Sequence, residues 1–208
     1  MKNYFQKVGA RRVIMMFVGN CILGLGISIF KLAGLGNDPF SGMNMAVAAV
    51  LAMSYPLFQI LINLVYFVVE AALGRRYIGI GTIVNAVLLG YLVSFFYAVL
   101  SPLYVPQTLP MQILVLLAGM IITSLGISLY QTSDVGVAPY DALSLIMAER
   151  INKLPYFWCR VITDGCCALI CFLSGGIIGL GTLVTAFGFG PFIHFFNVRV
   201  SEKLTGQK

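Results

Sequence analysis

The feature that most constrains this chain is a series of apolar runs, each about as long as a lipid bilayer is thick. Of its 208 residues, 60% are hydrophobic and only 10% are charged, whereas an average soluble domain is about a quarter charged. Because a helix rises about 1.5 Å per residue, about 20 apolar residues cross the roughly 30 Å hydrocarbon core. We therefore expect an all-α polytopic membrane protein, with residues 1–208 forming a single membrane domain. The six runs that we expect to be transmembrane helices are 13–33, 56–73, 78–100, 111–130, 156–174 and 177–197.

The chain also matches itself at a shift of 100 residues. The stretch "LGISIF" at 25–30 lies over "LGISLY" at 125–130, and "IGIGTIVNAVLLG" at 78–90 lies over "IGLGTLVTAFGFG" at 178–190. Unrelated apolar segments would not reproduce glycines in register, so the match indicates an internal duplication. The two repeats are residues 11–100 and 111–200.

Each repeat contains a short apolar segment that follows a glycine-rich turn. The turns are "AGLGNDPF" at 33–40 and "SDVGVAPY" at 133–140, and the segments lie near 40–53 and 140–150. Both segments are too short to span the bilayer easily. Glycine permits unusual backbone conformations, proline suits the first helical position, and Asp38 is placed to cap the helix that follows it. The predicted turn residues are Gly34, Gly36, Asp38, Pro39, Gly136 and Pro139.

The positions of the basic residues predict the topology, because Lys and Arg are enriched in cytoplasmic loops. If the short segments do not cross, every Lys and Arg except Lys31 lies on one side; if both cross, Arg75 and Arg76 move to the side of Lys31. The first arrangement is favoured. It predicts a multi-pass protein of the bacterial cytoplasmic (inner) membrane, with both termini cytoplasmic. Since each repeat has three spans, the repeats should be inverted; whether each short helix is re-entrant or interfacial stays open.

An inverted repeat with an interrupted element in each half is typical of transporters, whose binding site lies where the halves meet. Helical spacing places Ser41 and Asn44 on one face of the first short segment, and Asp141 and Ser144 on the equivalent face of the second. These polar faces favour a lined cavity, although small polar faces can also serve close helix packing. The candidate substrate-binding residues are Ser41, Asn44, Asn85, Asp141, Ser144 and Asp164.

Ionisable side chains within the apolar runs are costly to insert and are therefore candidates for function. Asp164 lies inside the fifth run, and Arg160 lies four residues earlier on the same helical face. The two residues form either a structural ion pair or part of a substrate or proton site. Asn85 is either a ligand or an interhelical hydrogen-bonding residue. Glu70 and His194 fall near the predicted cytoplasmic ends of their helices, where we expect them to be solvated.

At "GVAPYDAL" (136–143) and "GIGTIVNAVLLG" (79–90) the chain resembles the YczE/YitT-like bacterial integral membrane proteins, over nearly its whole length. Asp141 matches the acid that follows the aromatic residue of the family's turn, and Asn85 matches the asparagine of its glycine-rich helix. The other repeat departs from the pattern, with Ser41 and Thr185 at the equivalent positions. The resemblance implies a polytopic inner-membrane protein and adds little on mechanism.

The sequence lacks the motifs of common enzymes. It has one histidine and no H-E-x-x-H, G-x-S-x-G or P-loop pattern, so we predict no enzymatic activity, no cofactor and no metal site. We predict a transporter or permease for a small polar metabolite, coupled to protons through Asp141 and Asp164. The alternative is a non-transporting accessory protein that supports another complex or biosynthetic system. The expected partner is the lipid bilayer rather than nucleic acid, because the basic residues are scattered; a homodimer is left open.

Reporter fusions after Gly74 and Val105 test the predicted topology. We expect a cytoplasmic signal at Gly74 and an extracytoplasmic signal at Val105. An extracytoplasmic signal at Gly74 would show instead that the short segments cross the membrane.

Overall fold

This computed structural model describes residues 9–151 and 154–205, and within them it contains helices and no strand. Two short helices, α3 (Pro39–Val50) and α7 (Pro139–Arg150), follow the glycine-rich turns, and α10 (Glu202–Thr205) ends the described chain. The helix bounds lie within a few residues of those predicted from the apolar runs. The long helices are α2 (Ala10–Ala33), α4 (Tyr55–Leu73), α5 (Ile80–Leu100), α6 (Leu109–Thr132), α8 (Tyr156–Leu173) and α9 (Leu180–Phe196).

Six helical segments of the described chain are long and apolar enough to cross a membrane, which confirms the predicted all-α fold with six candidate spans. The last segment runs further than its apolar run, from Leu180 to Thr205, through a π-helical stretch at Asn197–Ser201. No glycine or proline interrupts the sequence between Asn197 and Gly206, so nothing in the sequence ends the helix at Asn197. A buried 2.5 Å hydrogen bond joins Ser201 to Ser128 and ties this extension to α6.

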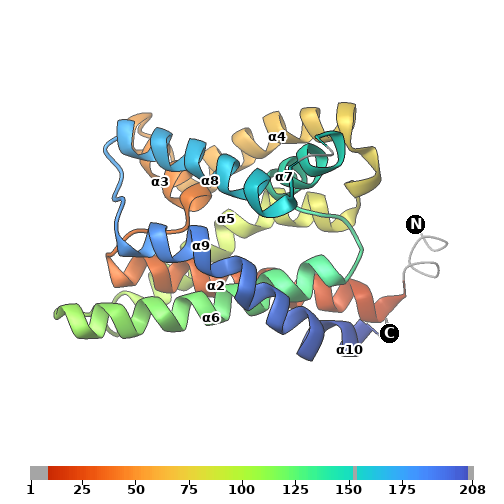
Figure 1. The fold of residues 1–208 in the computed structure, drawn as a ribbon. Helices are drawn as coiled ribbons and strands as arrows, with labels where there is room; N and C mark the ends of the chain where they lie inside the picture. The colour runs from red at the N-terminus through yellow and green to blue at the C-terminus, as the bar shows by residue number, and fades with distance from the viewer. Residues whose placement is uncertain (1–8, 152–153, 206–208) are drawn as a thin grey trace.

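The helices are arranged around a central pair, α2 and α6, which pack along each other (Figure 1). Helix α5 packs against α2, and α9 packs against α6. The short helices α3 and α7 lie on the other side of the bundle, where each of them contacts both α4 and α8. The start of α2 and helix α10 lie at the same end of the bundle (Figure 1), as an even number of crossings requires.

Helices α2 and α6 approach closely because glycines lie at their contact. A Cβ atom added to Gly126 would lie 2.5 Å from the backbone N of Leu23, and one added to Gly19 would lie 2.7 Å from the backbone N of Tyr130. Any side chain at these positions would therefore push the two backbones apart. Small residues that permit such contact are common where membrane helices associate, because apolar burial against a neighbouring helix has little advantage over contact with lipid.

Both glycine-rich turns have the backbone geometry that their sequences suggest. Gly34 ends α2 in the left-handed region, with φ of 69°. Gly36 and Gly136, which are 100 residues apart, have φ of 96° and 124°, where a side chain would be strained. Pro39 and Pro139 are the first residues of α3 and α7.

The turn of each half is hydrogen-bonded to the other half. The backbone N–H of Gly181, at the start of α9, donates to the carbonyl of Leu35 at 2.8 Å. The backbone N–H of Gly81, at the start of α5, donates to the carbonyl of Val135 at 3.0 Å. The two bonds join equivalent positions 100 residues apart. The exchange satisfies backbone groups at both helix starts and holds both turns inside the bundle.

Replacing Gly126 with alanine tests the close packing of α2 and α6. Its methyl group would overlap backbone atoms of α2, so we expect a loss of about 1–3 kcal/mol, seen as a lower Tm of the protein purified in detergent. The matched control is Gly165→Ala in α8, where an added Cβ meets no described atom within 4 Å. An unchanged Tm for Gly126→Ala would contradict the close approach of the two helices.

Candidate functional site

A partly buried arginine lies between two buried aspartates in the bundle. The Nε of Arg160 lies 3.4 Å from Asp164 Oδ2, one helical turn away on α8, and its Nη1 donates to Asp141 Oδ1 on α7. The side chains of Asp141 and Asp164 are 10% and 5% exposed, and that of Arg160 is 21% exposed. One guanidinium therefore compensates two carboxylates. Removing it would leave both acids buried without a counter-charge.

The remaining carboxylate oxygens of this cluster also have partners. The hydroxyl of Tyr140 donates to Asp164 Oδ1 at 2.5 Å, and Gln131 Nε2 donates to Asp141 Oδ2 at 3.4 Å. Residues from α6, α7 and α8 thus converge on one network. Charge-assisted hydrogen bonds of this kind are stronger than neutral ones, so the network fixes the orientation of the guanidinium.

An aromatic stack at the start of the two short helices positions Tyr140. Its ring lies parallel to that of Phe40, with centroids 4.2 Å apart and an interplanar angle of 7°. Phe40 and Tyr140 occupy equivalent positions, 100 residues apart, directly after Pro39 and Pro139. The guanidinium carbon of Arg160 lies 4.9 Å from the centroid of the Tyr140 ring, a cation–π distance. The stack therefore joins α3, α7 and α8 beside the ion cluster.

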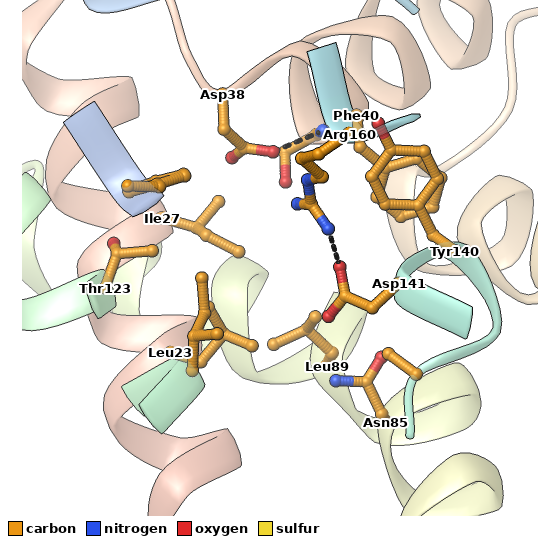
Figure 2. Close-up of a pocket in the computed structure, with 14 residues that line it drawn as sticks. Leu23, Ile27, Asp38, Phe40, Asn85, Leu89, Thr123, Tyr140, Asp141 and Arg160 are labelled. Carbon is orange, nitrogen blue, oxygen red and sulfur yellow. Dashed lines mark hydrogen bonds and ion pairs between the residues drawn. The ribbon is translucent and has the colours of Figure 1, made fainter. Parts of the chain in front are cut away.

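A cavity of about 50 Å³ opens between Arg160 and the central helices (Figure 2). A water molecule needs roughly 10–15 Å³ of cavity volume, so the cavity is large enough for several waters or for a solute of a few heavy atoms. Apolar side chains form much of its wall, including those of Leu23, Ile27 and Leu89. The polar and charged residues that line it are Asp38, Ser41, Asn85, Thr123, Tyr140, Asp141 and Arg160.

A second and larger cavity, of about 360 Å³, lies on the far side of Arg160. Its wall includes Asp164 and, near the C-terminal end of α9, His194 and Asn197. Arg160, Ile127 and Phe189 line both cavities. The guanidinium and two apolar side chains therefore separate a small inner chamber from a wider one.

The structure divides the six candidate substrate-binding residues among several environments. Ser41, Asn85 and Asp141 line the inner cavity, and Asp164 lines the outer one. Asn85 also donates to Asn20 Oδ1 at 2.8 Å, so it links α5 to α2 as well.

The other two candidates lie within helix contacts rather than at a cavity. The hydroxyl of Ser144 is 3.0 Å from that of Thr163, and the pair joins α7 to α8. Asn44 is fully buried, and neither of its side-chain amide atoms has a hydrogen-bond partner among the residues that the structure describes.

Two residues of the site were missed or misassigned from the sequence. Asp38 was predicted only to cap α3, and its Oδ2 does accept a hydrogen bond from Ser41 N at 2.9 Å, but the side chain also lines the inner cavity. Thr123 was not predicted to line a cavity, because a single threonine in an apolar run gives no signal of function. No local spacing connects Asp141 with Arg160, since their contact depends on how α7 packs against α8.

The expectation that Glu70 is solvated was wrong, because its side chain is completely buried. Gln59, Asn63 and Glu70 lie on one face of α4, at helical spacings of four and seven residues, and all three are buried. That face packs against protein rather than against solvent or lipid. The regular recurrence of polar residues along α4 was the signal that could have identified it.

The chain matches the model of a known family and several proteins of known sequence. Residues 10–198 match the model of a family described as "Family of unknown function (DUF6198)". An uncharacterized protein of Haemophilus influenzae is 28% identical over 84% of this chain and 78% of its own length. The uncharacterized membrane protein YczE of Bacillus subtilis is 26% identical over 86% of this chain and 82% of its own. The uncharacterized protein YyaS of Bacillus subtilis is 24% identical over 86% and 89%. No solved structure gives a significant match. The YczE relative confirms the resemblance predicted from the motifs.

Charge balance within the cluster can be tested by substitution. Arg160→Gln leaves two buried acids without a counter-charge, and we expect it to destabilise the protein by about 3–5 kcal/mol. The triple variant Arg160→Gln, Asp141→Asn, Asp164→Asn should recover most of the lost Tm. Arg150→Gln, at an exposed position, is the control. Equal Tm values for the single and triple variants would show that charge balance does not govern stability here.

Proposed function

The chain belongs to this family of unknown function, and we propose that it is a transporter for a small polar solute, with the Arg160 cluster at its binding site. The observation that carries the proposal is the position of Arg160 between two cavities, within a bundle of six candidate membrane spans. Charged residues inside membrane proteins commonly mark solute or ion pathways. A purely structural ion pair would need no cavity on either side.

We further propose that residues 11–100 and 111–200 are inverted repeats, with α3 and α7 as short non-spanning helices. Three observations support this. The reciprocal hydrogen bonds of Gly81 and Gly181 join equivalent positions, as a two-fold relation between halves would produce. Each repeat holds three candidate spans, an odd number. Finally, α3 and α7 have 12 residues each, or about 18 Å of helix, which is shorter than the roughly 30 Å hydrocarbon core.

The two halves differ at one pair of equivalent glycines, and the difference supports alternating access. A Cβ added to Gly90 of α5 would lie 2.8 Å from Pro56 Cα of α4. A Cβ added to the equivalent Gly190 of α9 would meet no described atom within 4 Å. Helices α4 and α5 are therefore in close contact at Gly90. The space beside α9 at Gly190 instead belongs to the larger cavity, which Gly190 lines.

A second set of equivalent positions is likewise in contact in the first half and open to the larger cavity in the second half. The Nζ of Lys31 lies 3.8 Å from the centroid of the Tyr97 ring, so these side chains meet across α2 and α5. Their equivalents, Gln131 and Asn197, line the larger cavity. We propose that solute reaches Arg160 through this open side, and that transport requires α8 and α9 to close while α4 and α5 separate.

The positions of the basic residues suggest the side of the membrane to which the larger cavity opens. By the positive-inside rule, the end that holds the start of α2 and helix α10 is cytoplasmic. His194 and Asn197 of the larger cavity lie near that end of α9. We therefore propose an inner-membrane protein with both termini cytoplasmic, whose site in this structure is open to the cytoplasm.

Single-cysteine labelling tests whether the larger cavity holds water. In a background where the five native cysteines are replaced, Ala186→Cys should react with a charged thiol reagent applied from the cytoplasmic side of membrane vesicles. Ala186 lines the cavity, and Leu183, the position of the matched control Leu183→Cys, lies on the same helix and is 57% exposed on the surface of the bundle. Labelling of Leu183→Cys alone, or of neither, would favour the accessory-protein alternative.

A further inference from the structure

Asp38 differs from the other two acids of the site in having a free oxygen. Its Oδ2 accepts the hydrogen bond from Ser41 N, whereas Oδ1 is buried and has no hydrogen-bond partner within the described part of the chain. All four carboxylate oxygens of Asp141 and Asp164 have partners. The unpartnered oxygen belongs to a side chain that lines the inner cavity (Figure 2).

The charges around the inner cavity do not balance. Arg160 is the only cation among the described residues that line it, and this residue is already shared by two carboxylates. Asp38 therefore adds a third acid without a positive charge of its own. Burial raises the pKa of Asp38 to about 6, so the carboxyl takes up a proton near neutral pH. The titratable groups that influence Asp38 or are influenced by it are Tyr55, Asp164, Arg160, Cys167 and Cys171.

The rest of the cavity wall indicates what shape of ligand would fit. The hydroxyl of Thr123 is buried and has no hydrogen-bond partner among the described residues, but it lies at the contact with Gly26 of α2, and the methyl group of Thr123 is directed toward the cavity (Figure 2). Leu23 and Ile27 add to this apolar wall, so that Asp38 Oδ1 is the polar group beside an apolar surface (Figure 2). A ligand with one charged hydrogen-bond donor and a short apolar body would satisfy both kinds of surface.

We propose that the inner cavity binds a small alkylammonium ion, whose N–H groups donate to Asp38 Oδ1, and that this cation exchanges with a proton on Asp38. The inference rests on the proposed transport function and names its substrate class. When the cation binds, Asp38 releases its proton to water; when Asp38 is protonated again, the cation leaves. One positive charge replaces another, so the charge of the chamber is unchanged.

This exchange assigns the proton to Asp38 rather than to Asp141 or Asp164. Those two acids hold Arg160 in place, and protonating either one would weaken its bond to the guanidinium or to Tyr140. Protonating Asp38 at Oδ1 disturbs no hydrogen bond that the structure shows. The cap on α3 is made by Oδ2 and persists in either state.

Binding of ethylammonium chloride to the full-length protein in detergent tests the proposal without requiring transport. We expect ethylammonium to raise Tm above pH 7, since a ligand that binds only the folded state stabilises it. The apparent Kd should rise about tenfold for each pH unit below about 6, as protons compete for Asp38. In weakly buffered solution near pH 5, where Asp38 is almost fully protonated, binding should release close to one proton per cation.

The diagnostic variant is Asp38→Asn, because asparagine caps helices about as well as aspartate. We expect it to keep the wild-type Tm without ligand, and to lose both ethylammonium binding and proton release. The matched control, Asp134→Asn, lies at an exposed turn and should behave as wild type. If Asp38→Asn lowers the ligand-free Tm, Asp38→Glu, which keeps the acid, should restore pH-dependent binding.

Two results would overturn the inference. One is ethylammonium binding that Asp38→Asn leaves unchanged in strength and pH dependence. The other is a wild-type protein that binds acetate or acetamide, which are close to ethylammonium in size, but not ethylammonium itself. The second result would reject an alkylammonium substrate and leave the proposed transport function standing, whereas a dry larger cavity in the cysteine-labelling experiment would reject transport whatever the ligand.

Discussion

Backbone groups without hydrogen-bond partners are costly inside a bilayer, and this constraint governs how the chain interrupts its helices. The two glycine-rich turns are held within the bundle because each gives a carbonyl, from Leu35 or Val135, to the first turn of a helix in the other half. Helices α3 and α7 begin four residues after these carbonyls, at Pro39 and Pro139. Their first residues then bring Phe40 and Tyr140 into contact, and the ion cluster forms beside the stack. The site therefore depends on hydrogen bonds that contain no side-chain atom.

The sequence predicted correctly those features that depend on a pattern within a single helix. Apolar run length located the long helices, and the four-residue spacing of Arg160 and Asp164 placed them within reach of each other. It was a poor guide to contacts between helices. Asp141 meets Arg160 only because α7 packs on α8, and no periodicity within either helix records that packing. Glu70 was misplaced for a related reason, since closeness to a helix end says nothing of which neighbour covers the side chain.

The two halves of the chain make equivalent backbone contacts at Gly81 and Gly181 but differ in their charged side chains. Asp141, Arg160 and Asp164 correspond to Ser41, Ile60 and Leu64 in the first half. The Arg160 cluster, whose charged residues have no counterparts at the equivalent positions of the first half, makes the environment of the inner cavity polar on one side. Asp38, from the first half, lines the same cavity as Arg160 and Asp141. Both halves therefore contribute to one site, and neither half contains it alone.

The parallel stack of Phe40 on Tyr140 limits how the two halves can move relative to each other. Stacked rings tolerate lateral offset, because offset arrangements are as favourable as direct overlap or more so, whereas pulling the rings apart would expose two apolar faces. Relative motion of α3 and α7 is therefore easiest as sliding in the plane of the rings. Such sliding would carry the Tyr140 hydroxyl along its bond to Asp164. A small shear between the short helices would in this way reorient the acid, and with it the guanidinium that separates the two cavities.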